Sequence, residues 1–241
     1  MKKTKKIGAL ILALGVFSAV GFTSCGGDGV KGNNSGSSAS ESSSAVDGED
    51  GKMASEDWET VISAFLATDN VTYCADVTQV RTSRNLEWVG TQTAKLADGV
   101  SYVMEVFTET YNGEVLEGSE EWYIYEKNGL TLQMYRDSYE TTEWALTQYD
   151  NPYYAPTIVG EALSKIALTE DALARYDAFS YDKMSNEYSM TDNGVTIKLT
   201  IKGDKVEKLS FYEGTESGYT DVRYTFSDYG VTVIGEIPSL E

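Results

Sequence analysis

The chain of 241 residues contains no histidine, two cysteines and three prolines. Without histidine it lacks the usual general base of serine and cysteine hydrolases and the common nitrogen ligand of zinc. It also has no glycine-rich phosphate loop and no basic stretch with interleaved aromatics, which are typical of nucleotide and nucleic-acid sites. The sequence therefore predicts a protein that is not an enzyme, with no catalytic residues, no metal and no cofactor.

Positive charge is also scarce, because 19 Lys and Arg residues face 38 Asp and Glu residues, for a formal net charge of -19. Such an acidic surface repels nucleic acid and anionic lipid headgroups, so we expect neither to be bound by electrostatic attraction. The simplest interpretation is that acidity keeps the protein soluble. Close carboxylates such as Glu117, Glu120 and Glu121 leave a glycosidase-like acid pair as an alternative, although chance proximity is expected in so acidic a chain.

The N-terminus combines a lysine cluster with an apolar run over residues 7–22 that ends in Thr23, Ser24 and Cys25. This is the shape of a secretory signal. Its end resembles the lipobox of bacterial lipoproteins, although Phe22 departs from the leucine that is usual there. The resemblance implies cleavage after Ser24 and a diacylglycerol on the Cys25 thiol, with palmitate as an acyl chain. An uncleaved membrane anchor is the alternative.

Lipidation of Cys25 would hold the protein at the membrane, because two acyl chains are enough for stable anchoring. Residues 1–24 carry four lysines and no acid, so their removal changes the formal charge from -19 to -23. Cys74 is then the only other thiol, which leaves no intramolecular disulfide. We expect Cys74 to be a packing residue in a strand.

Residues 25–52 are rich in Gly, Ser and Asn and contain almost nothing apolar. Such a stretch cannot form a core, so it is predicted to be a flexible tether with a reach of roughly 25 to 30 Å. Residues 53–241 have the length of one domain with a sizeable core. The predicted organisation is a signal peptide over 1–24, a lipidated tether over 25–52 and one domain over 53–241.

The domain begins with a predicted amphipathic helix. Ser55 is the expected N-cap, Glu56 and Asp57 suit the first turn, and an apolar face recurs at helical spacing. The residues of that face are Trp58, Val61, Ile62, Phe65 and Leu66.

The helix is followed by short runs in which apolar and polar residues alternate. The dipeptides between them favour hairpins: Asp98-Gly99, Asn112-Gly113, Asn128-Gly129, Asn193-Gly194 and, more weakly, Gly203-Asp204. We expect one apolar and one polar face, as in an antiparallel sheet. The residues expected to share faces include Val100 with Tyr102, Met104 and Val106; Trp122 with Ile124; Leu130 with Leu132 and Met134; and Val195 with Ile197, Leu199 and Ile201.

Two of the three prolines lie in residues 151–156 and interrupt the strands. Helical spacing follows over residues 158–166, and Thr169 is expected to cap a short helix that carries Leu173 and Tyr176. The predicted fold is α+β: a large curved antiparallel sheet, an open half-barrel of about ten to eleven strands. One face is covered by the N-terminal helix and the mid-chain helical insertion.

This order of elements on a lipobox-bearing chain, with a terminal hairpin over 205–211 and 224–230, resembles the lipoprotein-carrier superfamily. That superfamily comprises LolA-like carriers and related lipid-binding lipoproteins. The resemblance covers most of residues 58–238 and implies an apolar cavity for acyl chains between sheet and helices.

The residues expected to line such a cavity are Tyr102, Met104, Trp122, Ile124, Leu132, Met134, Ile197 and Leu199. The same residue types would also fill an ordinary core. We therefore expect a lipid-anchored monomer on the outer face of the cell membrane, from a Gram-positive source, which carries or senses a lipid or other apolar ligand. The alternative is a filled core and a surface that binds an envelope protein or a wall polymer, through tyrosines such as Tyr123, Tyr125 and Tyr135.

Overall fold

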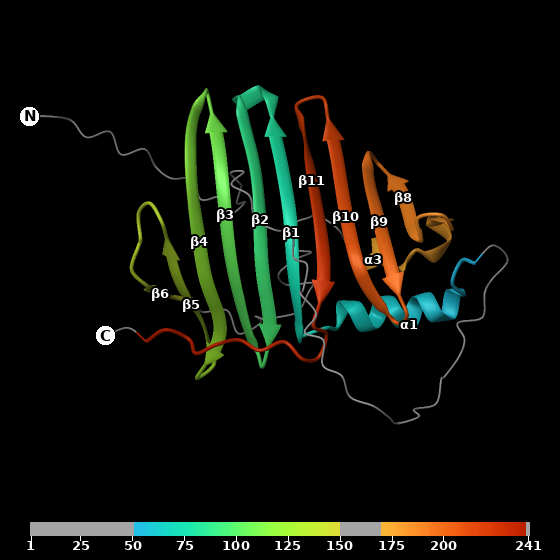
Figure 1. Cartoon of the computed structure of the whole chain (residues 1–241), viewed down its shortest axis with the longest axis horizontal. Coiled ribbons are helices and arrows are strands. Elements are labelled where there is room, and N and C mark those ends of the chain that lie inside the picture. The colour runs from blue at the N-terminus through green and yellow to red at the C-terminus, as the bar shows by residue number, and fades with distance from the viewer. Residues whose placement is uncertain (1–50, 150–169, 240–241) are drawn as a thin grey trace, which may run out of the picture.

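The computed structural model describes residues 51–149 and 170–239, and Figure 1 shows their arrangement. Eleven strands form a single open antiparallel sheet with the order β6-β5-β4-β3-β2-β1-β11-β10-β9-β8-β7. The strands are β1 (Val71–Arg81), β2 (Leu86–Ala97), β3 (Val100–Tyr111), β4 (Glu114–Lys127), β5 (Leu130–Asp137), β6 (Ala145–Tyr149), β7 (Ser180–Asp182), β8 (Glu187–Asp192), β9 (Val195–Lys202), β10 (Lys205–Thr215) and β11 (Gly218–Ser227). The predicted fold class, a curved half-barrel of the α+β type, is confirmed.

The sheet consists of two meanders that join at its centre. Strands β1–β6 form one meander and β7–β11 the other. The junction is the antiparallel pair of β1 and β11, in which Tyr73 lies opposite Phe226 and Val77 opposite Val222. The first and last strands are therefore central neighbours, while β6 and β7 are the edges.

The predicted hairpin turns all lie between neighbouring strands of the sheet. Both residues of Asn112-Gly113 have positive φ angles, 53° and 83°. Asp98-Gly99, Asn128-Gly129 and Asn193-Gly194 share this backbone geometry, which a type I′ turn requires. These dipeptides thus mark the ends of the strands that they join.

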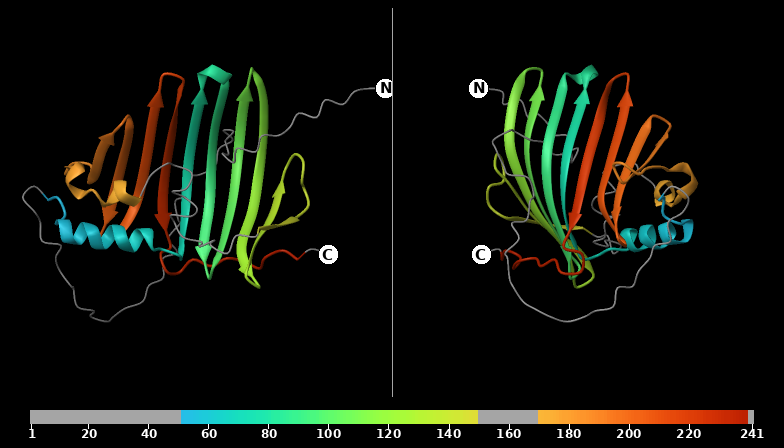
Figure 2. Two further views of the ribbon diagram at one scale, coloured as in Figure 1. Left: turned by 180° about the vertical axis from the view of Figure 1, so that it is seen from behind. Right: turned by 45° about the vertical axis from the view of Figure 1, so that its right-hand side comes forward.

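Helix α1 (Ser55–Leu66) covers one face of the β8–β11 end of the sheet, as the left panel of Figure 2 shows. Its N-cap is Ala54, without a side-chain hydrogen bond, so the predicted cap is wrong by one residue. Glu56 and Asp57 lie in the first turn as expected. The apolar face is buried except for half-buried Leu66.

The core lies between α1 and the sheet, on what we call the inner face. Trp58 is only 1% exposed and contacts the rings of Phe179 and Tyr188, and its Nε1 donates to the Leu173 carbonyl at 3.0 Å. Leu173 lies in α3 (Glu170–Ala174), as predicted, but Tyr176 belongs to a separate 3-10 turn, η3 (Tyr176–Ala178).

The start of the domain is attached to this helical end. The Lys52 ammonium donates to the Phe179 carbonyl at 2.7 Å and lies 3.9 Å from the centre of the Tyr176 ring. The Tyr176 hydroxyl in turn donates to the Met53 carbonyl at 2.6 Å. Whatever precedes Lys52 in the chain therefore leaves the domain beside η3.

Several predictions concern residues outside the described ranges. They are the signal peptide, Cys25, most of the tether, the proline segment over 151–156 and the helix expected over 158–166. No helix in the described residues is long and apolar enough to cross a membrane.

Cys74 lies in β1, as predicted, and its sulfur is 3.8 Å from the Thr93 hydroxyl. Cys74 is disulfide-bonded, whereas the absence of a disulfide is predicted for the lipidated protein and stays a prediction.

The alternation predicts correctly which residues share a face, but the expectation of one apolar and one polar face is wrong for part of the sheet. In β3, Ser101, Val103 and Phe107 belong to the inner face, while Tyr102 and Met104 point to the opposite side, which we call the outer face. On β3–β6 both faces therefore carry apolar side chains.

Candidate functional site

The eight residues expected to line one cavity do not lie together. Tyr102, Met104, Leu132 and Met134 gather on the outer face of β3–β5. Trp122 and Ile124 are half-buried on the inner face of β4. Ile197 and Leu199 lie on the inner face of β9. Along the sheet, β9 is six strand spacings, or roughly 30 Å, from β4.

Ile197 and Leu199 lie in a filled part of the molecule. They are 2% and 1% exposed and belong to the same buried cluster as Trp58 and Phe65 of α1. Phe65 meets Phe226 of β11 edge to face, with 5.0 Å between ring centres. At this end of the sheet the described side chains pack against one another as a core does.

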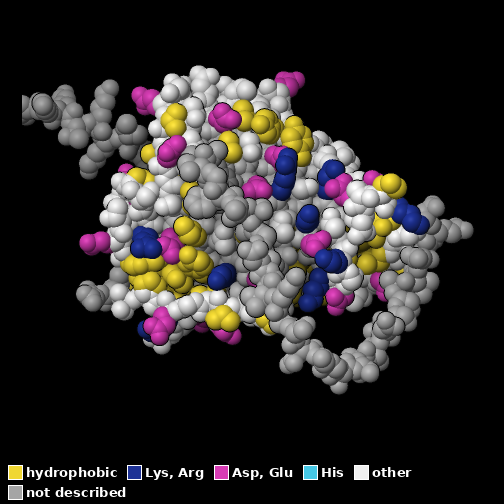
Figure 3. Space-filling model, viewed as in Figure 1, with side chains coloured by type: hydrophobic (Ala, Val, Ile, Leu, Met, Phe, Trp, Pro, Cys, Tyr) yellow, Lys and Arg dark blue, Asp and Glu magenta, His cyan; other side chains and the backbone are white. Residues whose placement is uncertain are grey.

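Two groups of side chains stand on the outer face. The first, which we call the aromatic patch, comprises Tyr102, Tyr123 and Trp144 together with Glu121 and Arg136. The ring centres of Tyr102 and Tyr123 are 4.7 Å apart, and those of Tyr123 and Trp144 are 5.5 Å apart. Hydrophobic side chains in Figure 3 gather over the corresponding strands at the lower left.

An ion pair is built into the aromatic patch. The Arg136 Nε donates to Glu121 Oε2 at 2.7 Å, and the guanidinium lies 4.6 Å from the centre of the Trp144 ring. The Tyr102 hydroxyl donates to the other carboxylate oxygen at 2.8 Å. Burial, together with this bond to Glu121, raises the pKa of Tyr102 well above its usual value, so its hydroxyl stays protonated.

Exposed apolar side chains border the aromatic patch. Met104 is 42% exposed beside Glu121, and Leu146 of β6 is 45% exposed beside buried Met134. Tyr125 also points outward, whereas Tyr135 lies on the inner face. The tyrosine surface expected from the sequence therefore exists in part, with Tyr102 and Trp144 in place of Tyr135.

The second group lines a groove of about 540 Å³ on the outer face of β8–β11 and β1, which we call the charged groove. Its lining includes the cations Lys198, Lys208 and Arg223, the carboxylates Asp76, Glu187 and Asp221, the hydroxyls of Thr196, Thr200, Ser210 and Thr225, and Tyr212. Lys and Arg side chains are visible over this half of the face in Figure 3.

Most charges in the charged groove are paired. Lys198 lies 2.6 Å from Glu187, and Arg223 lies 2.6 Å from Asp221. The hydrogen bond and charge of Asp221 raise the pKa of Arg223, and Asp76 on the neighbouring strand adds to this effect. Among the described residues, the Lys208 ammonium has no ion pair or hydrogen bond.

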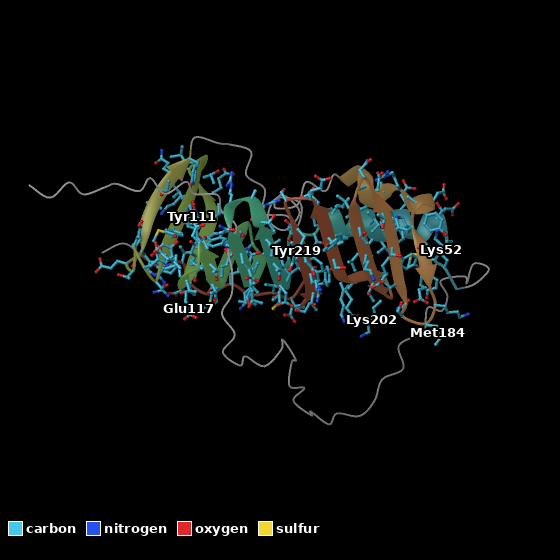
Figure 4. The ribbon with its side chains drawn as sticks, turned by 90° about the horizontal axis from the view of Figure 1, so that it is seen from above. Lys52, Tyr111, Glu117, Met184, Lys202 and Tyr219 are labelled. Atoms are coloured by element: carbon cyan, nitrogen blue, oxygen red, sulfur yellow. The ribbon has the colours of Figure 1, made fainter. Side chains whose placement is uncertain are left out.

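The sequence interpretation did not select the residues of the charged groove. Thr196, Lys198 and Thr200 alternate with the apolar residues of β9, and this pattern predicts only that they lie on its polar side. The available signal was the local concentration of cations: five of the thirteen Lys and Arg residues in the described ranges lie on β9–β11. In Figure 4, Lys202 of this group projects from the side of the sheet away from α1, as does Glu117 at the other end.

The acidic trio considered as a catalytic pair is divided between the two faces. Glu120 lies opposite Glu105 on the inner face and accepts a bond from the Tyr139 hydroxyl at 2.6 Å. Glu121 and Glu117 belong to the outer face, where Glu121 is engaged by Arg136. No group of acidic or cysteine side chains in the described ranges is arranged to hold a metal ion.

Comparisons with known proteins identify no family. No family model matches the chain, and no curated protein matches it. Among solved structures, the chain is similar to a DUF1329 family protein from Desulfovibrio piger, with 9% identity, a TM-score of 0.25 and coverage of 73% of this chain and 92% of that one. A likeness at that score supports no argument about this chain, and its resemblance to lipoprotein carriers stays a prediction.

Proposed function

We propose that this protein is a membrane-anchored, extracytoplasmic binding module without catalytic activity, and that it binds an envelope partner through the outer face of its sheet. The observation that carries this proposal is a difference between the two faces of the sheet: one is covered by a packed core, and the other presents side chains at the surface. Beneath α1 the inner face is a packed core, whereas the outer face presents the aromatic patch and the charged groove. The aromatic side chains of the patch are half-buried and Arg136 is exposed, and aromatic and Arg side chains are the types enriched at binding surfaces.

The anchor in this proposal is the lipid predicted on Cys25. It would hold the domain within a few nanometres of the bilayer, because the predicted tether is short. A partner within that distance is an envelope protein or a wall polymer, and a shuttle that crosses a wide compartment is disfavoured.

The test is photo-crosslinking in intact cells from two matched positions. Met104 is 42% exposed beside the aromatic patch, whereas Met184 is 95% exposed in the β7–β8 turn. A photoreactive residue in place of Met104 should give a defined adduct, and one in place of Met184 should not. Adducts of equal yield from both positions, or none from Met104, would count against the outer face.

A second candidate function is the binding of a lipid or other apolar ligand between sheet and helices, as carrier or sensor. The observation that favours it is that Trp122 and Ile124 are only half-buried on the inner face. Within the described residues, α1 contacts β10 and lies far from β4.

Native mass spectrometry after gentle extraction tests this second function. It predicts a bound lipid that is lost in Trp122→Ala but retained in Met184→Ala. A wild-type protein that carries no lipid would count against it and would leave the outer-face proposal intact.

A further inference from the structure

We infer that the charged groove binds an acidic glycan, with an anionic group of the ligand at Lys208 and a sugar ring against Tyr212. The inference deepens the proposed function and rests on it, since it names a ligand class for one part of the outer face.

The hydrogen-bonding capacity of the charged groove suits a glycan. Sugar hydroxyls both donate and accept, so their sites need donors and acceptors side by side. The charged groove provides these at close spacing: Lys198 beside Glu187, Arg223 beside Asp221, and four Ser and Thr hydroxyls between them. A polyanion such as nucleic acid would meet three carboxylates in the same groove.

An exposed aromatic residue, Tyr212, also lines the charged groove. Tyr212 is 45% exposed and stacks on Tyr219, with 6.0 Å between ring centres and an interplanar angle of 26°. The stack holds the Tyr212 ring in place, and an aromatic ring offers an apolar surface to the C–H groups of a sugar. A protein partner would instead require a largely apolar centre, which this groove lacks.

One of the three cations in the charged groove is not engaged by a carboxylate among the described residues. Lys198 and Arg223 are paired, whereas Lys208 is exposed and unpaired among the described residues. Lys208 and Tyr212 lie on the same face of β10, four residues or about 13 Å apart. A chain of several units could therefore reach both, with one anionic substituent at Lys208.

Calorimetric titration of the full-length protein with three probes tests the inference. Soluble peptidoglycan strands provide sugars with carboxylates, N-acetylchitohexaose provides neutral sugars, and poly-γ-glutamate provides carboxylates without sugars. We expect binding of the first, weaker binding of the second, and none of the third.

Three variants complete the test. Lys208→Gln should weaken binding of the strands about tenfold, because it removes a hydrogen bond to a charged group. Tyr212→Ala should weaken it about fivefold. Lys127→Gln is the matched control, since it removes the same charge from an exposed site at the β4–β5 turn, and it should change nothing.

Other outcomes overturn the inference. An affinity for poly-γ-glutamate equal to that for the peptidoglycan strands would indicate charge attraction without recognition of sugars. An equal affinity for the neutral oligosaccharide would show that Lys208 does not bind an anionic group of the ligand. Absence of all binding would reject the glycan. The crosslinking from Met104 would still decide the proposed function by itself, because Met104 lies outside the charged groove.

Discussion

Asp137 shows how backbone N–H groups can stabilise a buried acid in this fold. It ends β5, is 7% exposed, and its Oδ1 accepts hydrogen bonds from the backbone N–H groups of Tyr139, Glu140 and Thr141. Burial alone raises the pKa of the carboxyl, but these backbone hydrogen bonds outweigh it, so the net pKa lies below the ordinary value.

This lowered pKa predicts a pH-dependent effect for Asp137→Asn. A carboxyl whose pKa is lower in the folded state adds stability above its unfolded pKa and loses it as the pH falls through the folded pKa. We expect the variant to be about 1 to 2 kcal/mol less stable at about pH 7. Urea unfolding at several pH values measures the difference, which should shrink towards about pH 2. A difference that does not change with pH would contradict this.

Cys25 is the residue to which the sequence assigns the most specific chemistry. Its thiol cannot carry a diacylglycerol and also form a disulfide, and Cys74 is the only other cysteine. A disulfide between these two cysteines would therefore exclude the proposed lipid.

We predict that lipidation prevails in cells. Cys25→Ser should release the protein from the membrane fraction, because the predicted acyl chains are all attached through Cys25. Cys74→Ser is the control and should keep both the membrane fraction and the lipid mass. Intact-protein mass spectrometry decides, and a wild-type protein without lipid, in which the two cysteines are joined, would reject the anchor.

At the scale of elements, the turns illustrate which local signals suffice. Asn-Gly and Asp-Gly pairs place hairpins because their backbones reach positive φ at low cost. Gly218 differs from Gly113, although both have positive φ, at 143° and 83°. A Cβ at Gly113 would meet nothing within 4 Å, whereas one at Gly218 would lie 1.8 Å from the Val80 carbonyl oxygen.

The two glycines therefore predict different costs of substitution. Gly113→Ala should lower the free energy of unfolding by about 1 kcal/mol, through backbone strain alone. Gly218→Ala should cost more than twice as much, because β1 must move away from the start of β11. Urea unfolding of both variants provides the comparison, and equal losses would show that the close approach is not maintained.

Local sequence signals do not predict which face of the sheet a set of alternating residues occupies. Period-two alternation correctly placed Tyr102 with Met104, and Trp122 with Ile124. It could not say that the first pair lies on the outer face and the second on the inner face. That choice depends on where α1 packs, and α1 contacts β10, far from these residues in the sequence.

At the scale of the whole molecule, the central pair of β1 and β11 ties the two meanders together. Val222, Tyr224 and Phe226 of β11 are all buried in the core beneath α1. The N-terminal meander therefore completes its central pairing only when the last strand is present.

This topology predicts a cooperative loss of the whole fold. A chain that ends at Glu216 lacks β11 and should show no cooperative unfolding transition by circular dichroism, although it retains β1–β6. A chain that ends at Val233 is the control: it keeps β11 and the hydrogen bond from the Thr232 N–H to the Asn70 side chain at 2.9 Å. A stable, cooperatively unfolding fragment ending at Glu216 would show that the meanders fold independently.

The sequence by itself determined the position of α1, five of the hairpin turns and a strand count of about ten to eleven. These depend on helical spacing, turn dipeptides and alternation, all of which act within a few residues. Only the tertiary structure decided which face is covered, that Ile197 and Leu199 lie in a filled core, and that Lys198, Lys208 and Arg223 share a groove. The reason is physical: a groove across five strands is made by side chains that meet only once the sheet has paired β11 with β1.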